Sequence, residues 1–244
     1  MSLYNIFFED FTIPVLASGK GWIVVDKPCG LSIHNDPGRD LCSIVGDDFK
    51  KNRELSEQQA YDRNSGVNPV NRIDRDTSGI ILLGLNKETT AFLGRQFQER
   101  SVVKKYIALV HGYPDSEKAG NFWEMRLTAK AGGRKNPAGS GKKLPCSTKY
   151  RVLEKSVHYS LIECELLTGR KHQIRRHAKL NKTPITGDKK YGSPKSIQYL
   201  TDNCDYKRLG LHSRELQMMT PDGERLTIES PTPPEFMRLI KNDL

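Results

Sequence analysis

The sequence lacks the features of membrane-spanning and secreted disulfide-bonded proteins. No apolar run approaches the roughly 18 residues of a spanning helix. The N-terminus contains Glu9 and Asp10 instead of a basic start followed by an apolar core. The five cysteines are odd in number, and no two are spaced as CxxC, so neither a disulfide framework nor a zinc ribbon is predicted. We expect a cytoplasmic protein with reduced thiols and no membrane contact.

Several common catalytic motifs are also absent. The sequence has no GxGxxG after a predicted strand, no GxxxxGK[ST], no HExxH and no GxSxG. It therefore gives no support for dinucleotide redox chemistry, nucleotide hydrolysis or zinc peptidase chemistry.

Acidic residues are missing from two stretches that carry the positive charge. The chain has 39 Lys and Arg against 29 Asp and Glu, a net charge of +10. Residues 130–150 and 168–182 hold twelve basic residues and no acid, so the rest of the chain is net negative. Such clustering is what a polyanionic partner requires, although a generally basic, soluble surface is the simpler alternative. The basic residues are Lys130, Arg134, Lys135, Lys142, Lys143 and Lys149, then Arg170, Lys171, Arg175, Arg176, Lys179 and Lys182.

The 244 residues are enough for one domain with a sizeable core, and their pattern predicts mixed α and β structure. Residues 36–69 are polar and predict loops with a short helix. Residues 131–145 are rich in Gly and Lys and predict an exposed, mobile basic loop. Strands are expected at 22–26, 79–85, 102–110, 147–153 and 159–167, and helices after Asn86, at 171–182 and at 234–241.

Two segments concentrate polar chemistry beside predicted strands, residues 71–79 and 169–177. A carboxylate at the start of a buried strand, such as Asp74, is partly desolvated, and a neighbouring guanidinium can keep it ionised. Such a carboxylate can act as a nucleophile or a base. A structural ion pair remains the alternative, and on spacing alone it is favoured. A metal site formed by Asp74 and Asp76 is a weaker one, since no third ligand lies nearby in the sequence.

These segments resemble motifs of the RluA-like family of RNA pseudouridine synthases. NRIDRDTSG at 71–79 is similar to the family's HRLDxxTSG signature, with Asn71 where the family usually has His. Five more segments follow in the family's order, so the resemblance covers about residues 22–233. RKHQIRRH at 170–177 is also similar to the tRNA pseudouridine synthase C branch. The five segments are VDKPCGL at 25–31, KKYIALV at 104–110, GRKHQIR at 169–175, PITGDKKYG at 184–192 and LGLH at 209–212.

The resemblance implies a site for isomerising uridine in RNA. Asp74 is expected to be the catalytic carboxylate, Tyr106 to pack on the target base and assist proton transfer, and Arg175 to pair with Asp74. Arg72 is expected to enter the RNA and hold the uridine out of the stack, and Ile174 to line the base pocket. Neither a cofactor nor a metal is implied. Further RNA contacts are expected from Lys27, Arg170, Lys171, His172, Gln173 and Arg176.

The resemblance also implies the fold and the partners. We expect an α+β catalytic domain over residues 1–244, with a long, mainly antiparallel mixed sheet, helices on its faces and a central RNA-binding cleft. Residues 1–20 are expected to be an N-terminal extension, with no accessory RNA-binding domain before them. The implied partner is tRNA or ribosomal RNA, bound by a monomer. The alternatives are a non-catalytic RNA-binding or chaperone protein on the same fold and a metal-dependent nuclease.

Overall fold

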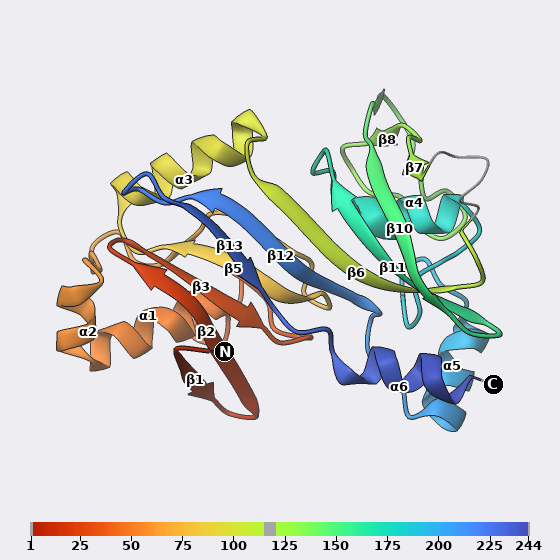
Figure 1. The fold of residues 1–244 in the computed structure, drawn as a ribbon, viewed down its shortest axis with the longest axis horizontal. Coiled ribbons are helices and arrows are strands. Elements are labelled where there is room, and N and C mark those ends of the chain that lie inside the picture. The colour runs from red at the N-terminus through yellow and green to blue at the C-terminus, as the bar shows by residue number, and fades with distance from the viewer. Residues whose placement is uncertain (1, 115–120, 244) are drawn as a thin grey trace. The chain divides into compact units, whose positions relative to one another are not determined.

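A computed structural model describes residues 2–114 and 121–243, which fold as two compact units (Figure 1). Unit 1 comprises residues 1–104 and 213–230, and unit 2 comprises residues 105–212 and 231–244. Within the described residues, no helix has the length and apolar character needed to cross a membrane.

Unit 1 is built on antiparallel strands that run β1-β2-β3-β5 across the sheet. The hairpin of β12 and β13 continues beyond β5, and the short β4 also pairs with β5. Within the segment expected as an extension, residues 4–8 and 11–19 form β1 and β2. The bounds are β1 Tyr4–Phe8, β2 Phe11–Gly19, β3 Trp22–Lys27, β4 Asn68–Pro69, β5 Ser78–Gly84, β12 Leu211–Met219 and β13 Arg225–Glu229.

Helices cover both faces of this sheet. On one face of the sheet, residues such as Val25 and Ile81 pack against α1 (Leu41–Lys51). On the opposite face, residues such as Ile80 pack against α3 (Lys87–Glu99). The helix expected after Asn86 is confirmed, and the Asn86 side chain caps it by accepting a hydrogen bond from the Thr89 amide. Because both faces are covered, β5 is buried along its whole length.

The prediction of loops with one short helix for residues 36–69 is wrong. The segment contains two helices, α1 and α2 (Arg53–Gln58). The apolar residues that α1 buries, Leu41, Ile44, Val45 and Phe49, do follow helical spacing, but charged and small residues between them obscure the pattern.

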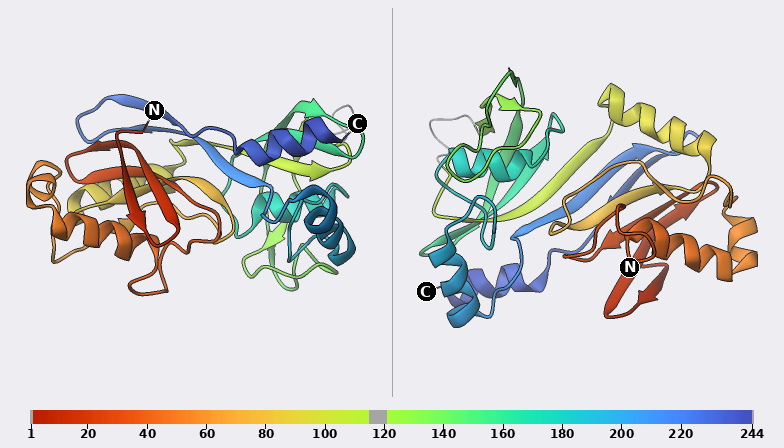
Figure 2. Two further views of the ribbon diagram at one scale, coloured as in Figure 1. Left: turned by 90° about the horizontal axis from the view of Figure 1, so that it is seen from below. Right: turned by 180° about the vertical axis from the view of Figure 1, so that it is seen from behind.

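Unit 2 has its own antiparallel sheet in the order β6-β11-β10-β7. Ile107 and Leu161 share one face and pack against α6 and α5. Tyr106, Cys164 and Tyr150 lie opposite one another on the other face, which α4 covers. The left view of Figure 2 shows α6 and α4 on opposite sides of β6. The bounds are β6 Val103–His111, β7 Phe122–Trp123, β10 Thr148–Lys155, β11 Tyr159–Leu166, α4 Gln173–Leu180, α5 Pro194–Cys204 and α6 Pro234–Asn242.

The predicted α+β fold with mainly antiparallel strands is confirmed.

Candidate active site

Asp74 begins a tight turn that leads into the buried strand β5. The Asp74 carbonyl oxygen accepts a hydrogen bond of 3.1 Å from the Thr77 amide, which closes the turn. The Asp74 residue is half-buried, whereas the neighbouring Arg72 is exposed. The turn thus carries a half-buried aspartate two residues after an exposed arginine.

Lys27 anchors the turn that begins at Asp74. Its side chain is fully buried, and Nζ donates hydrogen bonds to the carbonyl oxygens of Pro28 and Leu31, both at 2.8 Å, and of Arg75 at 2.9 Å. Arg75 and Gly30 add two reciprocal bonds, from the Gly30 amide at 3.0 Å and from Arg75 Nε at 2.7 Å. The expectation that Lys27 contacts RNA is wrong, because its ammonium group is enclosed by protein carbonyls. It holds the turn that carries Asp74.

Asn71, which stands where the family usually has His, also has a structural contact. Its Oδ1 accepts a hydrogen bond of 2.8 Å from the Leu82 amide in β5. The side chain thereby ties the start of the Asp74 segment to the sheet of unit 1.

Arg175 lies in α4 of unit 2 and is almost fully buried. Its Nε and Nη2 each donate a 2.8 Å hydrogen bond to the Asp188 carboxylate, and the guanidinium lies 5.3 Å from the centre of the Tyr191 ring. Burial alone would raise the pKa of Asp188, but the bonds and charge of Arg175 hold that pKa below its usual value. This bidentate geometry fixes the guanidinium plane.

Sequence reasoning missed Asp188 as a functional partner. The residue lies in the quoted segment PITGDKKYG, and its Oδ1 also accepts hydrogen bonds from the amides of Lys190 and Tyr191. The only sequence signal was an acid in a motif that also contains an aromatic residue, whereas the burial of Asp188 and its pairing with Arg175 are seen only in the structure.

Tyr106 and Ile174 also lie in unit 2. Both are buried, with exposures of 6% and 4%, and Tyr106 lies on the sheet face that α4 covers. An aromatic ring and an aliphatic chain here suit the walls of a base-binding pocket.

The remaining residues of the 170–176 run differ in their access to solvent. Lys171 is exposed and Arg170 half-buried, so both can reach a ligand. His172 has a left-handed backbone (φ 55°), and its Nδ1 lies 2.9 Å from the Tyr191 hydroxyl.

Gln173 and Arg176 are corrected from RNA contacts to structural residues. Gln173 is buried, and its amide group bonds the Ser147 carbonyl, the Thr148 and Thr168 hydroxyls and the Arg170 amide. Arg176 is fully buried and donates only to protein oxygens in its described contacts.

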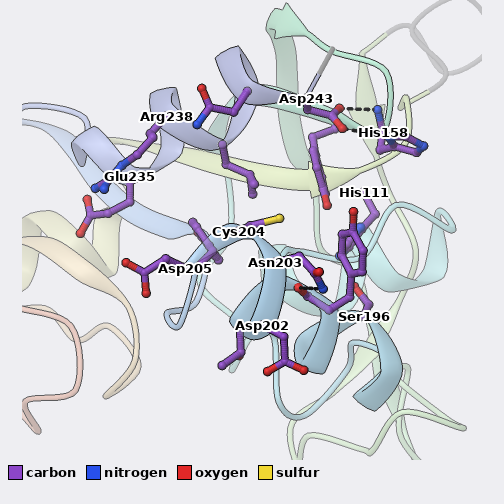
Figure 3. Close-up of a pocket in the computed structure, with 16 residues that line it drawn as sticks. His111, His158, Ser196, Asp202, Asn203, Cys204, Asp205, Glu235, Arg238 and Asp243 are labelled. Carbon is purple, nitrogen blue, oxygen red and sulfur yellow. Dashed lines mark hydrogen bonds and ion pairs between the residues drawn. The ribbon is translucent and has the colours of Figure 1, made fainter.

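Unit 2 also contains a cavity of about 870 Å³ beside α5 and α6 (Figure 3). It contains none of the site residues expected from the sequence. Its lining includes Asp202, Asp205, Glu235 and Asp243, which disfavour binding of phosphate groups. His111 Nε2 lies 2.9 Å from the Ser196 hydroxyl here, and burial lowers the pKa of His111. We do not assign the active site to this cavity.

Across residues 2–114 and 121–243, no three His, Cys, Asp or Glu side chains come together as a metal-binding group. Asp74 and Asp76 thus gain no third ligand of these types in the described chain.

Comparisons with known proteins agree with this fold and these motifs. A solved human structure, RNA Pseudouridylate Synthase Domain Containing 4, matches with a TM-score of 0.72 and 25% identity, covering 92% of this chain and 90% of that one. A second, Human RNA Pseudouridylate Synthase Domain Containing 1, has a TM-score of 0.65 at 22% identity and covers 91% and 84% of the two chains. The fold is therefore that of the pseudouridine synthases.

Sequence comparison defines the family. The sequence profile described as RNA pseudouridylate synthase matches residues 21–180. The ribosomal large subunit pseudouridine synthase C of Vibrio cholerae is 34% identical over 86% of this chain and 62% of its own length. The uncharacterized RNA pseudouridine synthase YlyB of Bacillus subtilis is 31% identical over 98% of this chain and 75% of its own. The chain belongs to the RNA pseudouridylate synthase family, and it spans about three fifths to three quarters of these relatives.

Proposed function

We propose that this protein is an RNA pseudouridine synthase that flips a uridine out of its stack and isomerises it. The bond between uracil nitrogen 1 and the ribose breaks, the uracil turns, and carbon 5 joins the same sugar carbon. The proton on carbon 5 is released, and nitrogen 1 gains a proton. No electron donor or group donor is consumed, so the balance requires no cofactor.

The observation that carries the proposal is the turn of Asp74, which lies inside the family match and is held by the buried ammonium of Lys27. A half-buried carboxylate on a fixed turn is suited to act on the sugar carbon as a nucleophile or to remove a proton as a base. In the same proposal, Arg175 supplies a positive charge to the catalytic site, Tyr106 and Ile174 contact the flipped base, and Arg72 enters the RNA.

Ribosomal RNA of the large subunit is the first substrate to test, because several relatives carry it in their names. Transfer RNA is the second, on the similarity of residues 170–177 to the tRNA branch. We propose that the protein acts as a monomer in the cytoplasm.

A non-catalytic RNA-binding or chaperone protein is the second candidate, because the two acid-free basic stretches would serve it without an active site. Release of tritium from RNA labelled at carbon 5 of uracil separates the candidates, since of the two only the isomerase replaces that hydrogen.

The decisive variant is Asp74→Asn, which keeps the shape of the side chain and removes its charge. We expect it to abolish tritium release while RNA binding persists. Asp222→Asn, an exposed aspartate in the β12–β13 turn, is the matched control and should keep wild-type release. Wild-type turnover in Asp74→Asn would refute the assigned carboxylate. Wild-type protein that binds RNA but releases no tritium from either RNA would favour the chaperone.

A further inference from the structure

Arg176 makes an unusual set of contacts for a residue in a basic motif. The side chain is fully buried, and burial lowers the pKa of its guanidinium below its usual value. All three guanidinium nitrogens donate to protein oxygens. Nε reaches Pro137 O at 2.6 Å, Nη2 reaches Ala138 O at 2.6 Å and Thr128 Oγ1 at 3.2 Å, and Nη1 reaches Thr128 O at 3.0 Å and Lys171 O at 3.2 Å.

Four of these five bonds hold one segment, residues 126–144, which we name the basic loop. Its ends pair as the short strands β8 (Leu127–Thr128) and β9 (Lys143–Leu144). The Thr128 amide donates to Ala138 O at 3.0 Å across the loop. The expected exposed loop at 131–145 is therefore exposed at its tip but buried at Pro137 and Gly139, where Arg176 and Thr128 anchor the backbone.

Gly139 shows independently that the basic loop has a defined shape. Its φ is +81°, a backbone conformation that favours glycine, and a Cβ atom at this position would collide with Thr128 Oγ1. The loop is thus closed by a close approach that an alanine would prevent.

The outer surface of the basic loop is strongly cationic. It contains no acid, and six of its basic side chains are exposed, whereas the carbonyl oxygens of Thr128, Pro137 and Ala138 accept from the buried Arg176. Exposed cations on a shaped backbone suit the phosphates of a nucleic acid, because neutralising them releases counterions. The six are Arg126, Lys130, Arg134, Lys135, Lys142 and Lys143.

We propose that Arg176 is a positioning residue that shapes the basic loop into a binding surface for RNA phosphates flanking the target uridine. The identification of the ligand as substrate RNA rests on the proposed function. Arg175 and Arg176 are consecutive in α4, so they project about 100° apart around the helix. Arg175 bonds Asp188 and Arg176 bonds the basic loop. The helix α4 therefore positions both Asp188 and the loop.

The surface is tested by neutralising four exposed loop cations together, Lys130, Arg134, Lys135 and Lys142, to Ala. The probe is a fluorescein-labelled RNA stem-loop whose binding is measured at increasing salt. Each lost phosphate contact removes about 0.7–0.9 from the slope of log affinity against log salt, so we expect a slope smaller by about 2–4. The charge-matched control changes four exposed lysines outside the loop, Lys20, Lys51, Lys87 and Lys241. Equal salt-dependence slopes in the two quadruple variants would overturn the proposal that the basic loop binds RNA phosphates.

The positioning role is tested by Arg176→Lys and Gly139→Ala. A lysine keeps the charge but cannot span the acceptors of a planar fork, and the alanine opens the loop without touching Arg176. We expect both variants to speed limited tryptic cleavage at the already exposed Arg134 and Lys135, because the backbone around them is held less firmly. We also expect them to raise the KM for a large-subunit ribosomal RNA transcript about tenfold, with a smaller fall in kcat. Unchanged cleavage and KM in folded Gly139→Ala would overturn the role, even if Arg176→Lys fails to fold.

These outcomes are distinguishable from failure of the proposed function. If wild-type protein binds the stem-loop with the larger salt slope but forms no pseudouridine, the enzyme assignment fails and the loop surface stands. If wild-type protein forms pseudouridine and the loop variant matches its control, the loop surface fails alone.

Discussion

At the scale of single residues, the most informative side chains are buried cations. Lys27 and Arg176 carry charges that the sequence suggested were for RNA, yet both are 0% exposed and bonded to carbonyl oxygens. A buried charge is tolerated only when dipoles replace its water. Neither burial is predictable from the residue type, since one of the carbonyls that enclose Lys27 belongs to Arg75, 48 residues further along the chain.

Lys27→Met should therefore weaken unfolding stability and catalysis together. The substitution keeps the approximate length of the side chain but removes the ammonium donor from the carbonyl oxygens of Pro28, Leu31 and Arg75, of which Arg75 O retains its bond from the Gly30 amide. We expect a loss of roughly 2–4 kcal/mol in the free energy of unfolding by urea denaturation, with a fall in pseudouridine yield because the Asp74 turn loosens. Lys20→Met, at an exposed lysine of the same unit, should change neither. Wild-type stability in Lys27→Met would contradict the role of the ammonium.

His177 should make the protein sensitive to mild acid. Burial lowers its pKa from 6.5 to about 4, and its ring lies 3.0 Å from both Thr148 Oγ1 and Met125 O. The unfolded chain takes up the proton first, so stability is complete above pH 6.5 and is lost as the pH falls towards 4. The loss is roughly 3 kcal/mol. Between pH 7.5 and pH 4, the urea midpoint of His177→Gln should fall less steeply with pH than that of the wild type. Equal dependence of the two midpoints on pH would refute His177 as the source of the acid sensitivity.

At the scale of elements, the strands and helices with a continuous apolar run or a clear cap were predictable. β3 and β5 follow from their apolar residues, and α3 follows from Asn86. The length of α1 was not predicted because Gly46, Asp47 and Asp48 separate its buried residues Val45 and Phe49. Packing against the sheet, and not local sequence, determines the stability of this helix. Motif resemblance placed Asp74 and Arg175 in their segments, but the Asp188 partner needed coordinates.

The glycine of the TSG motif is required where two strands approach. Gly79 in β5 has a φ of +108°, and a Cβ atom there would collide with the carbonyl oxygen of Ser213 in β12. Gly79→Ala should therefore lower the free energy of unfolding by about 2 kcal/mol or more. Gly94→Ala in α3 has open space around it and is the control. Thermal melts of both variants test this, and a Gly79→Ala midpoint equal to wild type would contradict the close approach.

At the scale of the whole molecule, no disulfide contributes to stability. All five cysteines are free thiols, as the sequence predicted, and burial raises the pKa of Cys164 above its usual value and that of Cys42 to about 12. Melting temperatures with and without dithiothreitol should agree within about 2 °C, a difference worth under about 1 kcal/mol for a chain of this size. A fall of many degrees on reduction would show an unexpected crosslink.

The enclosure of Lys27 has a practical consequence for chemical footprinting. An acylating reagent that modifies accessible amines will label surface lysines quickly and will spare Lys27 for as long as the hydrogen-bonded cage around Nζ stays shut. Mass spectrometry of the peptide containing residue 27 would then report transient opening of the cage in the native protein, without a spectroscopic label and without any ligand.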